Sequence, residues 1–209
     1  MNAGPRVILA SGSPRRQALL DDLGLVYDVR PANVDEEAIG RGLAPEAFVA
    51  AVAKAKAMVG EPGDVPVLGA DTIVVGPDGA IGKPSDRDET VAVLRSLSRR
   101  SAQILTGVAL RSGEQTHVRT IETTVHFREL SLDEITRYVE TGAGDDKAGG
   151  LELQGGAAPF IEKVAGCWTN VVGLPLCSVA ELLTSTRHGL VDARRCRTRT
   201  GALCPRVAD

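Results

Sequence analysis

The chain has 209 residues, of which 43% are hydrophobic and 24% are charged, and its formal net charge is −3. This length suits one compact α/β domain or a domain with a tail, and the apolar content is sufficient for a sizeable core. The small negative charge argues against binding to nucleic acid or to an anionic membrane, and aromatic residues at 3% argue against a stacking platform for single-stranded nucleic acid.

The N-terminal segment and the cysteines predict a cytoplasmic protein. The apolar stretch over residues 7–10 is short and is followed by arginines, unlike the layout of a signal peptide, and no apolar run is long enough to span a bilayer. None of the four cysteines forms a Cys-x-x-Cys pair, so we expect neither a zinc site nor a disulfide framework. Cys167 and Cys177 are expected to be small buried hydrophobes in a reducing compartment, and the other two cysteines are Cys196 and Cys204.

The first half of the chain alternates between strand and helix patterns. An apolar run over residues 6–10 predicts a strand, after which Ser13 and Pro14 suit the N-cap and first position of a helix that ends at Gly24. Further expected elements are a strand over 26–31, a helix over 45–59, a strand over 65–75, a hairpin turn at 77–79 and a helix that Ser85 opens.

The second half predicts a hairpin of long strands, two helices and a glycine-rich loop. The expected elements are strands over 102–111 and 116–130, a helix over 131–141, a loop over 142–156, a strand-like segment over 159–172 with a turn near Gly166, and a helix over 175–187. We therefore expect an α/β domain over residues 1–187, with a mixed twisted sheet flanked by helices, and a disordered tail over 188–209.

The junction between the first strand and the first helix has the features of an anion site. A helix N-terminus presents unpaired N–H groups and the positive end of the helix dipole, which together favour phosphate. Arg15 and Arg16 lie in the first turn, where a cation opposes the dipole at a cost of a few tenths of a kcal/mol to about 1 kcal/mol. A bound anion would offset that cost, although two solvated surface arginines are the simpler alternative.

Lys56 and Asp71 are charged residues in apolar surroundings. Lys56 falls within the apolar stripe of its helix, where it is either aimed at a ligand or extends its ammonium group out of the rim of the core. Asp71 interrupts the apolar strand VPVLGADTIVV, and a buried carboxylate needs a metal, a cation or strong hydrogen-bond donors. The strand on both sides of Asp71 favours a functional acid over a turn-capping one.

Other candidates are weaker when each is taken alone. Asp35 and Glu36 could supply oxygens for a hard cation, and Lys83 is held in the loop Gly-Lys-Pro. Lys147 and Gln154 lie in the glycine-rich loop, where the backbone allows a close approach and a glutamine amide offers both the donor and the acceptor that base recognition requires. Each of these residues would also be unremarkable on a solvated loop.

Taken together, the motifs resemble those of the Maf family of nucleotide pyrophosphatases. The matching stretches occur in family order over roughly residues 6–186: LASGSPRRQALL, the loop at 34–36, the helix lysine, GADTIVV, GKP, DKAGG, LQGGAAPFIEKVAG and NVVGLPL. The resemblance implies an α/β fold like that of inosine triphosphate pyrophosphatases, a divalent cation (Mg²⁺ or Mn²⁺), frequent dimers, and hydrolysis between the α- and β-phosphates of a nucleoside triphosphate.

The resemblance also implies roles for individual residues. Asp71 resembles the catalytic base of the family, and with Glu36 it is expected to hold the metal. The residues that resemble the substrate contacts are Ser13, Arg15, Lys56, Thr72, Lys83, Lys147 and Gln154. Family members that act on dTTP and UTP resemble this chain in having the residues found here as Arg15, Thr72 and Gln154. A glutamine suits these substrates, because its amide can pair with the donor and acceptor edge of uracil or thymine.

The chain departs from the family pattern at two positions and in its tail. Ala143 stands where a glutamate is frequent, and Leu151 stands where a tyrosine is common. The alternatives left open are the same chemistry on another base, such as 7-methyl-GTP, and a nucleotide-binding regulator of cell division or septum formation that does not catalyse. An aspartyl-phosphate phosphatase would require a second aspartate two residues from Asp71, where the chain has Gly69 and Ile73.

Overall fold

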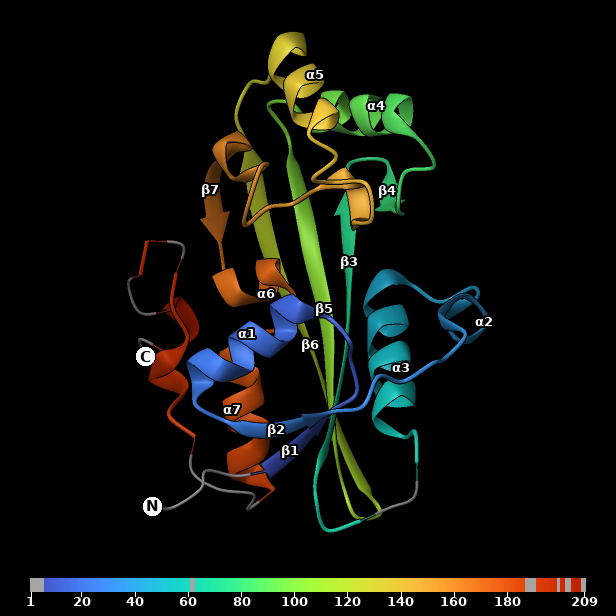
Figure 1. Cartoon of the computed structure of the whole chain (residues 1–209), viewed down its shortest axis with the longest axis vertical. Coiled ribbons are helices and arrows are strands. Elements are labelled where there is room, and N and C mark those ends of the chain that lie inside the picture. Colours follow the sequence, from blue (N-terminus) through green and yellow to red (C-terminus); the bar gives the residue numbers. More distant parts are fainter. Residues whose placement is uncertain (1–5, 61–62, 187–190, 199, 202–203, 208–209) are drawn as a thin grey trace.

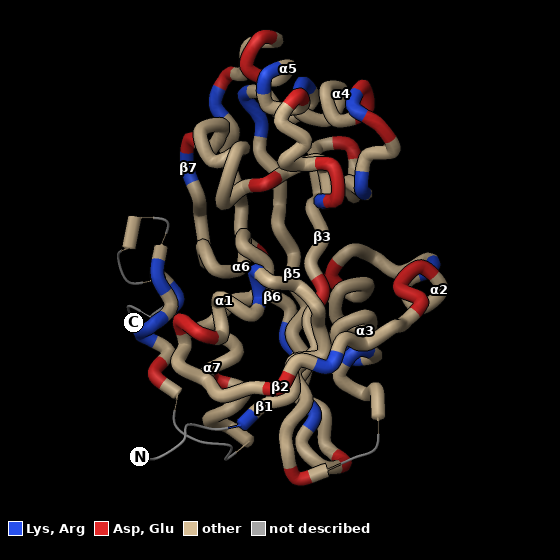
Figure 2. The backbone as a smooth tube through the Cα atoms, in the orientation of Figure 1, with Lys and Arg blue, Asp and Glu red and all other residues tan. Residues whose placement is uncertain are grey.

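The computed structural model of the chain describes residues 6–60, 63–186, 191–198, 200–201 and 204–207 (Figure 1). None of the helices in these ranges has the length and apolar character that would be needed to cross a bilayer. Acidic and basic residues alternate over most of the described chain, in keeping with its small net charge (Figure 2).

The centre of the fold is a mixed seven-stranded sheet with the strand order β2-β1-β3-β5-β6-β7, and β4 pairs with β3 outside this path. The β1–β2 and β1–β3 pairs are parallel, and all other pairs are antiparallel. The mixed sheet that the sequence predicts is therefore confirmed. The strands are β1 (Arg6–Leu9), β2 (Val26–Val29), β3 (Val67–Gly76), β4 (Gly79–Ile81), β5 (Ser101–Ser112), β6 (Gln115–Phe127) and β7 (Ile161–Ala165).

Helices cover the sheet in three groups (Figure 1). In the lower half of the view, α1, α6 and α7 lie together on one side and α3 lies on the other with α2 beside it, whereas α4 and α5 pack against each other at the upper end. The α-helices are α1 (Pro14–Leu23), α2 (Glu36–Gly40), α3 (Pro45–Ala57), α4 (Arg87–Leu97), α5 (Leu132–Glu140), α6 (Trp168–Val172) and α7 (Leu176–Ser185). Short 3-10 helices are η1 (Ala148–Gly150), η2 (Ala158–Phe160), η3 (Ala193–Arg195) and η4 (Pro205–Val207).

Three elements differ from the sequence prediction. The loop expected around Glu36 contains α2, which Asp35 caps by accepting a hydrogen bond from the backbone N–H of Ala38 at 2.9 Å. Helix α4 begins one residue after Asp86, whose side chain accepts from Glu89 N at 2.8 Å, so Asp86 and not Ser85 is its N-cap. The segment expected to be strand-like over 159–172 contains β7 and the predicted turn at Gly166, whose φ is 127°, but the part after the turn is the helix α6 and not a strand.

The long strands β3 and β5 run through two hydrophobic cores. Leu68 of β3 belongs to a lower core that β1, α1 and α7 complete, whereas Val74 of the same strand belongs to an upper core with α4 and α5. The segment of β3 between these two residues lies where the two cores meet, and it contains Asp71 and Thr72.

Two glycines allow α3 to pack directly on the sheet. A Cβ atom at Gly69 of β3 would collide with the backbone oxygen of Ala53, and one at Gly107 of β5 would collide with the backbone oxygen of Val49. The far end of α3 is held by Arg111, which donates to the carbonyl oxygens of Met58 at 3.0 Å and Gly60 at 2.8 Å. This close approach brings Lys56 of α3 against β3.

The tail differs from the disordered segment that the sequence predicts, as far as its described residues show. Cys196 and Cys204 are fully buried and join the lower core, and Arg195 donates to the backbone oxygen of Asp22 at 3.4 Å. Small thiol side chains can be buried at little cost, which explains how an otherwise polar segment packs here. The remainder of the predicted tail, residues 188–190, 199, 202–203 and 208–209, lies outside the described residues, as does residue 187 at the end of the predicted domain.

Candidate active site

The candidate site lies at an open edge of β3. On this edge, β3 pairs with β1 through Val67 and Leu68, and with β4 through Val74 and the two residues after it. Among the described strands, none pairs with the segment 69–73 on this edge, since β5 takes the opposite edge. An open edge between a parallel and an antiparallel neighbour is a place where side chains from several segments can meet around a ligand.

A buried lysine joins two carboxylates on the α3 side of this edge. Lys56 Nζ lies 2.8 Å from Asp71 Oδ1 and 2.8 Å from Glu36 Oε1. The side chains of Lys56 and Asp71 are 9% and 7% exposed, whereas that of Glu36 is 48% exposed. The structure buries both of these charged side chains, and each compensates the charge of the other; the ammonium group of Lys56 does not extend out of the core into solvent.

The second carboxylate oxygen of Asp71 is available for a further interaction. Asp71 Oδ2 is buried and has no hydrogen-bond partner among the described residues. A buried charged oxygen without a partner is costly, so the arrangement fits an additional cation or a hydrogen-bond donor supplied by a ligand. Two carboxylates that converge from β3 and α2 form an oxygen donor set suited to a hard divalent cation such as Mg²⁺.

Arg16 builds a rigid frame on the other side of the edge. Its guanidinium donates to Gly173 O at 2.9 Å, to Ser11 Oγ at 3.0 Å and to Thr72 Oγ1 at 3.2 Å. Thr72 Oγ1 also lies 2.9 Å from Thr106 Oγ1, so the threonine hydroxyl is fixed from two directions. Burial lowers the pKa of Arg16, and the nearby negative charges of Asp71 and Glu36 act in the opposite sense.

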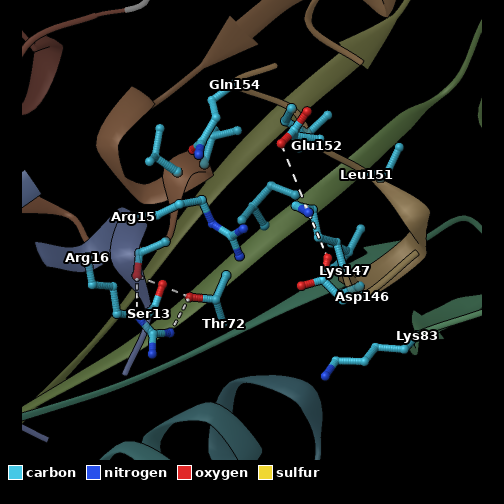
Figure 3. A pocket seen from close by; sticks show the side chains of 17 residues that line it. Ser13, Arg15, Arg16, Thr72, Lys83, Asp146, Lys147, Leu151, Glu152 and Gln154 are labelled. Carbon is cyan, nitrogen blue, oxygen red and sulfur yellow. Dashed lines mark hydrogen bonds and ion pairs between the residues drawn. The ribbon is translucent and has the colours of Figure 1, made fainter. Parts of the chain in front are cut away.

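Arg15 is arranged differently from Arg16. Arg15 is exposed, its guanidinium points into the cavity, and it donates to none of the described side chains (Figure 3). The sequence predicted Arg15 as the ligand-binding arginine, and the structure leaves it available for that role, whereas Arg16 orders the site. The two adjacent arginines of the first helical turn therefore differ: Arg16 is held by contacts within the protein, whereas Arg15 faces the cavity.

A cavity of about 260 Å³ lies beside Thr72 and between the two cores. Its four cationic residues are Arg15 and Arg16 of α1, Lys83, and Lys147 of the glycine-rich loop, and Figure 3 shows that they come from separate segments around the opening. Apolar side chains, Gln154 and the acidic residues Asp146 and Glu152 also line the cavity. The apolar members are Val74, Ile104, Ala148, Leu151, Leu153, Val171 and Val172.

The glycine-rich loop is fixed by one tyrosine. Tyr138 Oη donates to Gly150 O at 2.7 Å and accepts from Glu152 N at 2.9 Å, and burial raises its pKa. Lys147 lies 2.7 Å from Asp146 Oδ1 and 4.0 Å from Glu152 Oε1, so its ammonium group is held near the cavity. The hydrogen bond from Lys147 lowers the pKa of Asp146.

The structure gathers the predicted residues into two adjoining groups. The group that lines the cavity is Ser13, Arg15, Thr72, Lys83, Lys147 and Gln154, and the group on the α3 side of β3 is Glu36, Lys56 and Asp71. Asp71 and Thr72 are consecutive in β3, so their side chains point to opposite faces at the same open edge.

Some details of these residues could not be read from the sequence. Ser13 occupies the N-cap of α1 as predicted, but within the described structure its side chain makes no capping hydrogen bond. Leu151, where the pattern departs from the family, is buried in the upper core and lines the cavity, and Ala143 packs against that core. The sequence indicates Arg16 as a candidate but does not predict that it holds Gly173, Ser11 and Thr72 in place. It also does not predict Glu152 as a cavity residue, because an acidic side chain in a glycine-rich loop is usually solvated.

Comparison with known proteins gives one consistent result. Residues 6–186 match the family described as "Maf-like protein". A protein named dTTP/UTP pyrophosphatase from Symbiobacterium thermophilum is 47% identical over 182 residues, which cover 86% of this chain and 93% of the relative. Proteins of the same name from Pelotomaculum thermopropionicum and Geotalea uraniireducens are 44% identical (85% of this chain, 94% of the relative) and 41% identical (92% of this chain, 100% of the relative).

Proposed function

The chain belongs to the Maf family, and from this premise we propose that it hydrolyses dTTP and UTP to the nucleoside monophosphate and pyrophosphate. The observation that carries the proposal is the open edge of β3. There, an acid with one oxygen that has no partner among the described residues adjoins a cavity lined by four cationic side chains and a glutamine. The relatives that share this sequence pattern are named for the same activity.

The cavity on the Thr72 side suits the nucleoside. Leu151, Leu153 and Val171 offer an apolar wall to a flat base, and a pyrimidine buried there would leave water at little polar cost. The amide of Gln154 carries both a donor and an acceptor, as the N3–H and a carbonyl oxygen of uracil or thymine require. A guanine base would present two hydrogen-bond donors to this position. A carboxylate can accept from both of them, whereas a glutamine amide has only one acceptor oxygen.

The triphosphate extends across the open edge of β3 from the cavity toward Asp71. Arg15 and Lys83 are exposed at the mouth of the cavity, and neither has an ion-pair partner among the described residues, so each is free to bind a phosphate oxygen. Lys147 adds a further positive charge, which the carboxylates of Asp146 and Glu152 partly neutralise. Cations placed where negative charge develops stabilise the transition state of phosphoryl transfer.

The reaction is an in-line attack of water on the α-phosphorus. The water oxygen forms the new bond to phosphorus, its proton passes to the free oxygen of Asp71, and the bond to the bridging oxygen breaks. The electron pair remains on the departing pyrophosphate, where Arg15 and Lys83 neutralise the charge. Lys56 fixes the position of the Asp71 side chain through the 2.8 Å contact to Oδ1, and a positioned base of this kind contributes about 10²- to 10⁴-fold in rate.

Asp71 and Glu36 are the residues that would hold a divalent cation, Mg²⁺ or Mn²⁺. When bound, such an ion supplies charge neutralisation for the phosphates and polarises the attacking water. Lys56 already bridges both carboxylates, so it fixes their spacing before a cation arrives.

The proposal places the enzyme in the cytoplasm and as a homodimer. The four cysteines are free thiols in the structure, which suits a reducing compartment. The dimer follows from the resemblance to the family and would be measured by sedimentation or light scattering of the full chain.

The experiment is a nucleotide panel with separate detection of pyrophosphate and inorganic phosphate. The purified full chain would be given dTTP, UTP, dCTP, GTP and 7-methyl-GTP, each with Mg²⁺, with Mn²⁺ and with a chelator. We expect pyrophosphate from dTTP and UTP in the presence of a cation, little turnover of the purines, and loss of turnover with the chelator.

Three results would contradict parts of the proposal. Equal rates on all bases would refute base reading by Gln154, and faster turnover of 7-methyl-GTP would assign the enzyme to another substrate. Tight nucleotide binding without any pyrophosphate release would favour a regulatory protein that does not catalyse.

A further inference from the structure

All four cysteines of the chain meet at one place in the lower core. Their sulfur atoms all lie within 4.8 Å of one another, and all four side chains are buried. They come from four separate segments: Cys167 precedes α6, Cys177 lies in α7, Cys196 follows η3 and Cys204 precedes η4. None of them lines the nucleotide cavity described above.

The spacing of the sulfur atoms corresponds to tetrahedral coordination of one metal ion. A Zn–S bond is about 2.3 Å long, so the sulfurs of a tetrahedral Zn(Cys)₄ site lie about 3.8 Å apart. Cys167 Sγ is 3.6 Å from Cys196 Sγ and 3.9 Å from Cys177 Sγ. A disulfide would instead bring two sulfurs to about 2.05 Å and leave the other two out, whereas here all four are close together.

We propose that Cys167, Cys177, Cys196 and Cys204 bind one Zn²⁺ ion in a structural tetrathiolate site that fastens the C-terminal tail to the catalytic domain. The site has no position for a water or a substrate, because four protein ligands complete the coordination of a structural zinc. Binding converts the four thiols to thiolates, and their protons pass to the solvent.

The surrounding hydrogen bonds suit thiolates at this position. Thr169 Oγ1 lies 3.1 Å from Cys167 Sγ and 3.2 Å from Cys196 Sγ, and it accepts a hydrogen bond from Leu176 N at 3.0 Å. The hydroxyl accepts from Leu176 at one lone pair, and it can donate its single hydrogen to one of the two sulfurs. A second group of contacts that orients the ligands in this way is typical of metal sites.

The two tail ligands are held side by side. The backbone N–H of Cys204 donates to Cys196 O at 3.1 Å. Both ligands lie beyond the family match, which ends at residue 186.

The site would also stabilise one wall of the nucleotide cavity. Cys167 is the N-cap of α6, whose last residues Val171 and Val172 line the cavity together with Gly173. Gly173 O accepts from Arg16, so a fixed α6 fixes the frame around Thr72. We therefore expect loss of the ion to lower thermal stability first and activity only as a consequence.

The test is the metal content of the purified full chain. The protein would be produced with zinc in the medium, exchanged into metal-free buffer and analysed by elemental mass spectrometry; we expect about one zinc per chain. The double variant Cys196→Ser/Cys204→Ser should retain less than a tenth of this zinc. Val191→Ala is the matched control, because Val191 packs against the same core without offering a ligand, and it should retain zinc fully.

Two further measurements separate the site from its alternatives. Glu36→Gln should retain its zinc, because the carboxylates near β3 form a different site; loss of zinc in this variant would overturn the assignment to the cysteines. Wild-type protein reconstituted with Co²⁺ should show the intense visible absorption of tetrahedral cobalt together with thiolate charge-transfer bands, even if the double variant fails to fold. The proposal would be refuted by the absence of both retained zinc and the cobalt spectrum. It would also be refuted if the site held iron in place of zinc, or if mass measurement found two disulfides.

Discussion

Replacing Lys56 by methionine tests the electrostatic arrangement at the centre of the site. Methionine keeps the length of the side chain but removes the ammonium group that lies 2.8 Å from both Asp71 and Glu36. The substitution leaves the buried carboxylate of Asp71 without a protein partner, since its other oxygen already lacks one among the described residues.

The expected loss of stability follows from the burial of each pair. Glu36 is 48% exposed, so its contact with Lys56 belongs to the class of surface ion pairs, which contribute about 0–1 kcal/mol. Asp71 and Lys56 are 7% and 9% exposed, and removal of one partner from such a buried pair costs about 3–5 kcal/mol. We therefore expect Lys56→Met to lower the free energy of unfolding by about 3–5 kcal/mol, most of it from the unpaired acid.

Chemical denaturation of the wild type, Lys56→Met and Lys56→Met/Asp71→Asn measures this directly. The double variant should be more stable than the single one, because it removes the uncompensated charge. Mg²⁺ or Mn²⁺ should raise the melting temperature of Lys56→Met more than that of the wild type, because the cation replaces the ammonium group between the two carboxylates. A loss below about 1 kcal/mol, with no recovery in the double variant, would refute the reasoning.

Three other predictions concern packing, specificity and pH. Gly69→Ala should cost about 1–3 kcal/mol in thermal or chemical unfolding and lower kcat, because its Cβ would push α3 and Lys56 away from β3; an unchanged stability would contradict the close packing. Gln154→Glu should lower kcat/KM for dTTP about tenfold and improve the relative turnover of 7-methyl-GTP; an unchanged ratio in competition assays would remove Gln154 from base reading. The hydrogen bond from Arg128 lowers the pKa of Glu134 to about 2, so its stabilisation is complete above the unfolded pKa of about 4.5 and disappears as the pH falls toward about 2. Glu134→Gln should therefore be less stable than the wild type at pH 7, and the two melting temperatures should converge as the pH is lowered over that range; a gap independent of pH would contradict this origin.

Most of the elements could be predicted from the sequence because their signals are local. Pro14 at the start of α1 and Gly24 in the left-handed conformation at its end fix that helix, and the capping box of Ser131 and Glu134 fixes the start of α5. Helix α2 was missed because five residues give too short a pattern for helical periodicity. The segment that follows β7 was misjudged because α6 is also short, and its stability comes from Asn170, which donates to Ile104 O at 2.9 Å and to Ile121 O at 3.2 Å.

The structure brings the predicted site residues together, but the different contacts that each of them makes could not be predicted. A lysine in an apolar helix stripe and an aspartate in an apolar strand are visible anomalies, and their pairing follows from the close packing of α3 on Gly69. Arg15 and Arg16 are identical neighbours in sequence, and only the tertiary contacts of Arg16 with Ser11, Thr72 and Gly173 distinguish them.

The cysteine cluster could not have been found from spacing. Sequence rules for metal sites rely on two ligands within a few residues, as in Cys-x-x-Cys, and the nearest pair here, Cys196 and Cys204, is eight residues apart. The sequence predicts no metal site at the cysteines, whereas the structure brings one sulfur from each of four separate segments to the same point in the core, and our zinc proposal rests on this geometry.

The central claim is that Asp71 activates the water that attacks the α-phosphorus. Its most direct test is pyrophosphate release from dTTP by Asp71→Asn under single-turnover conditions, with nucleotide binding and melting temperature measured on the same sample. We predict that release falls by about 10²-fold or more while the nucleotide still binds and the protein remains folded. Release at the wild-type rate would show that another group activates the water and would contradict the account.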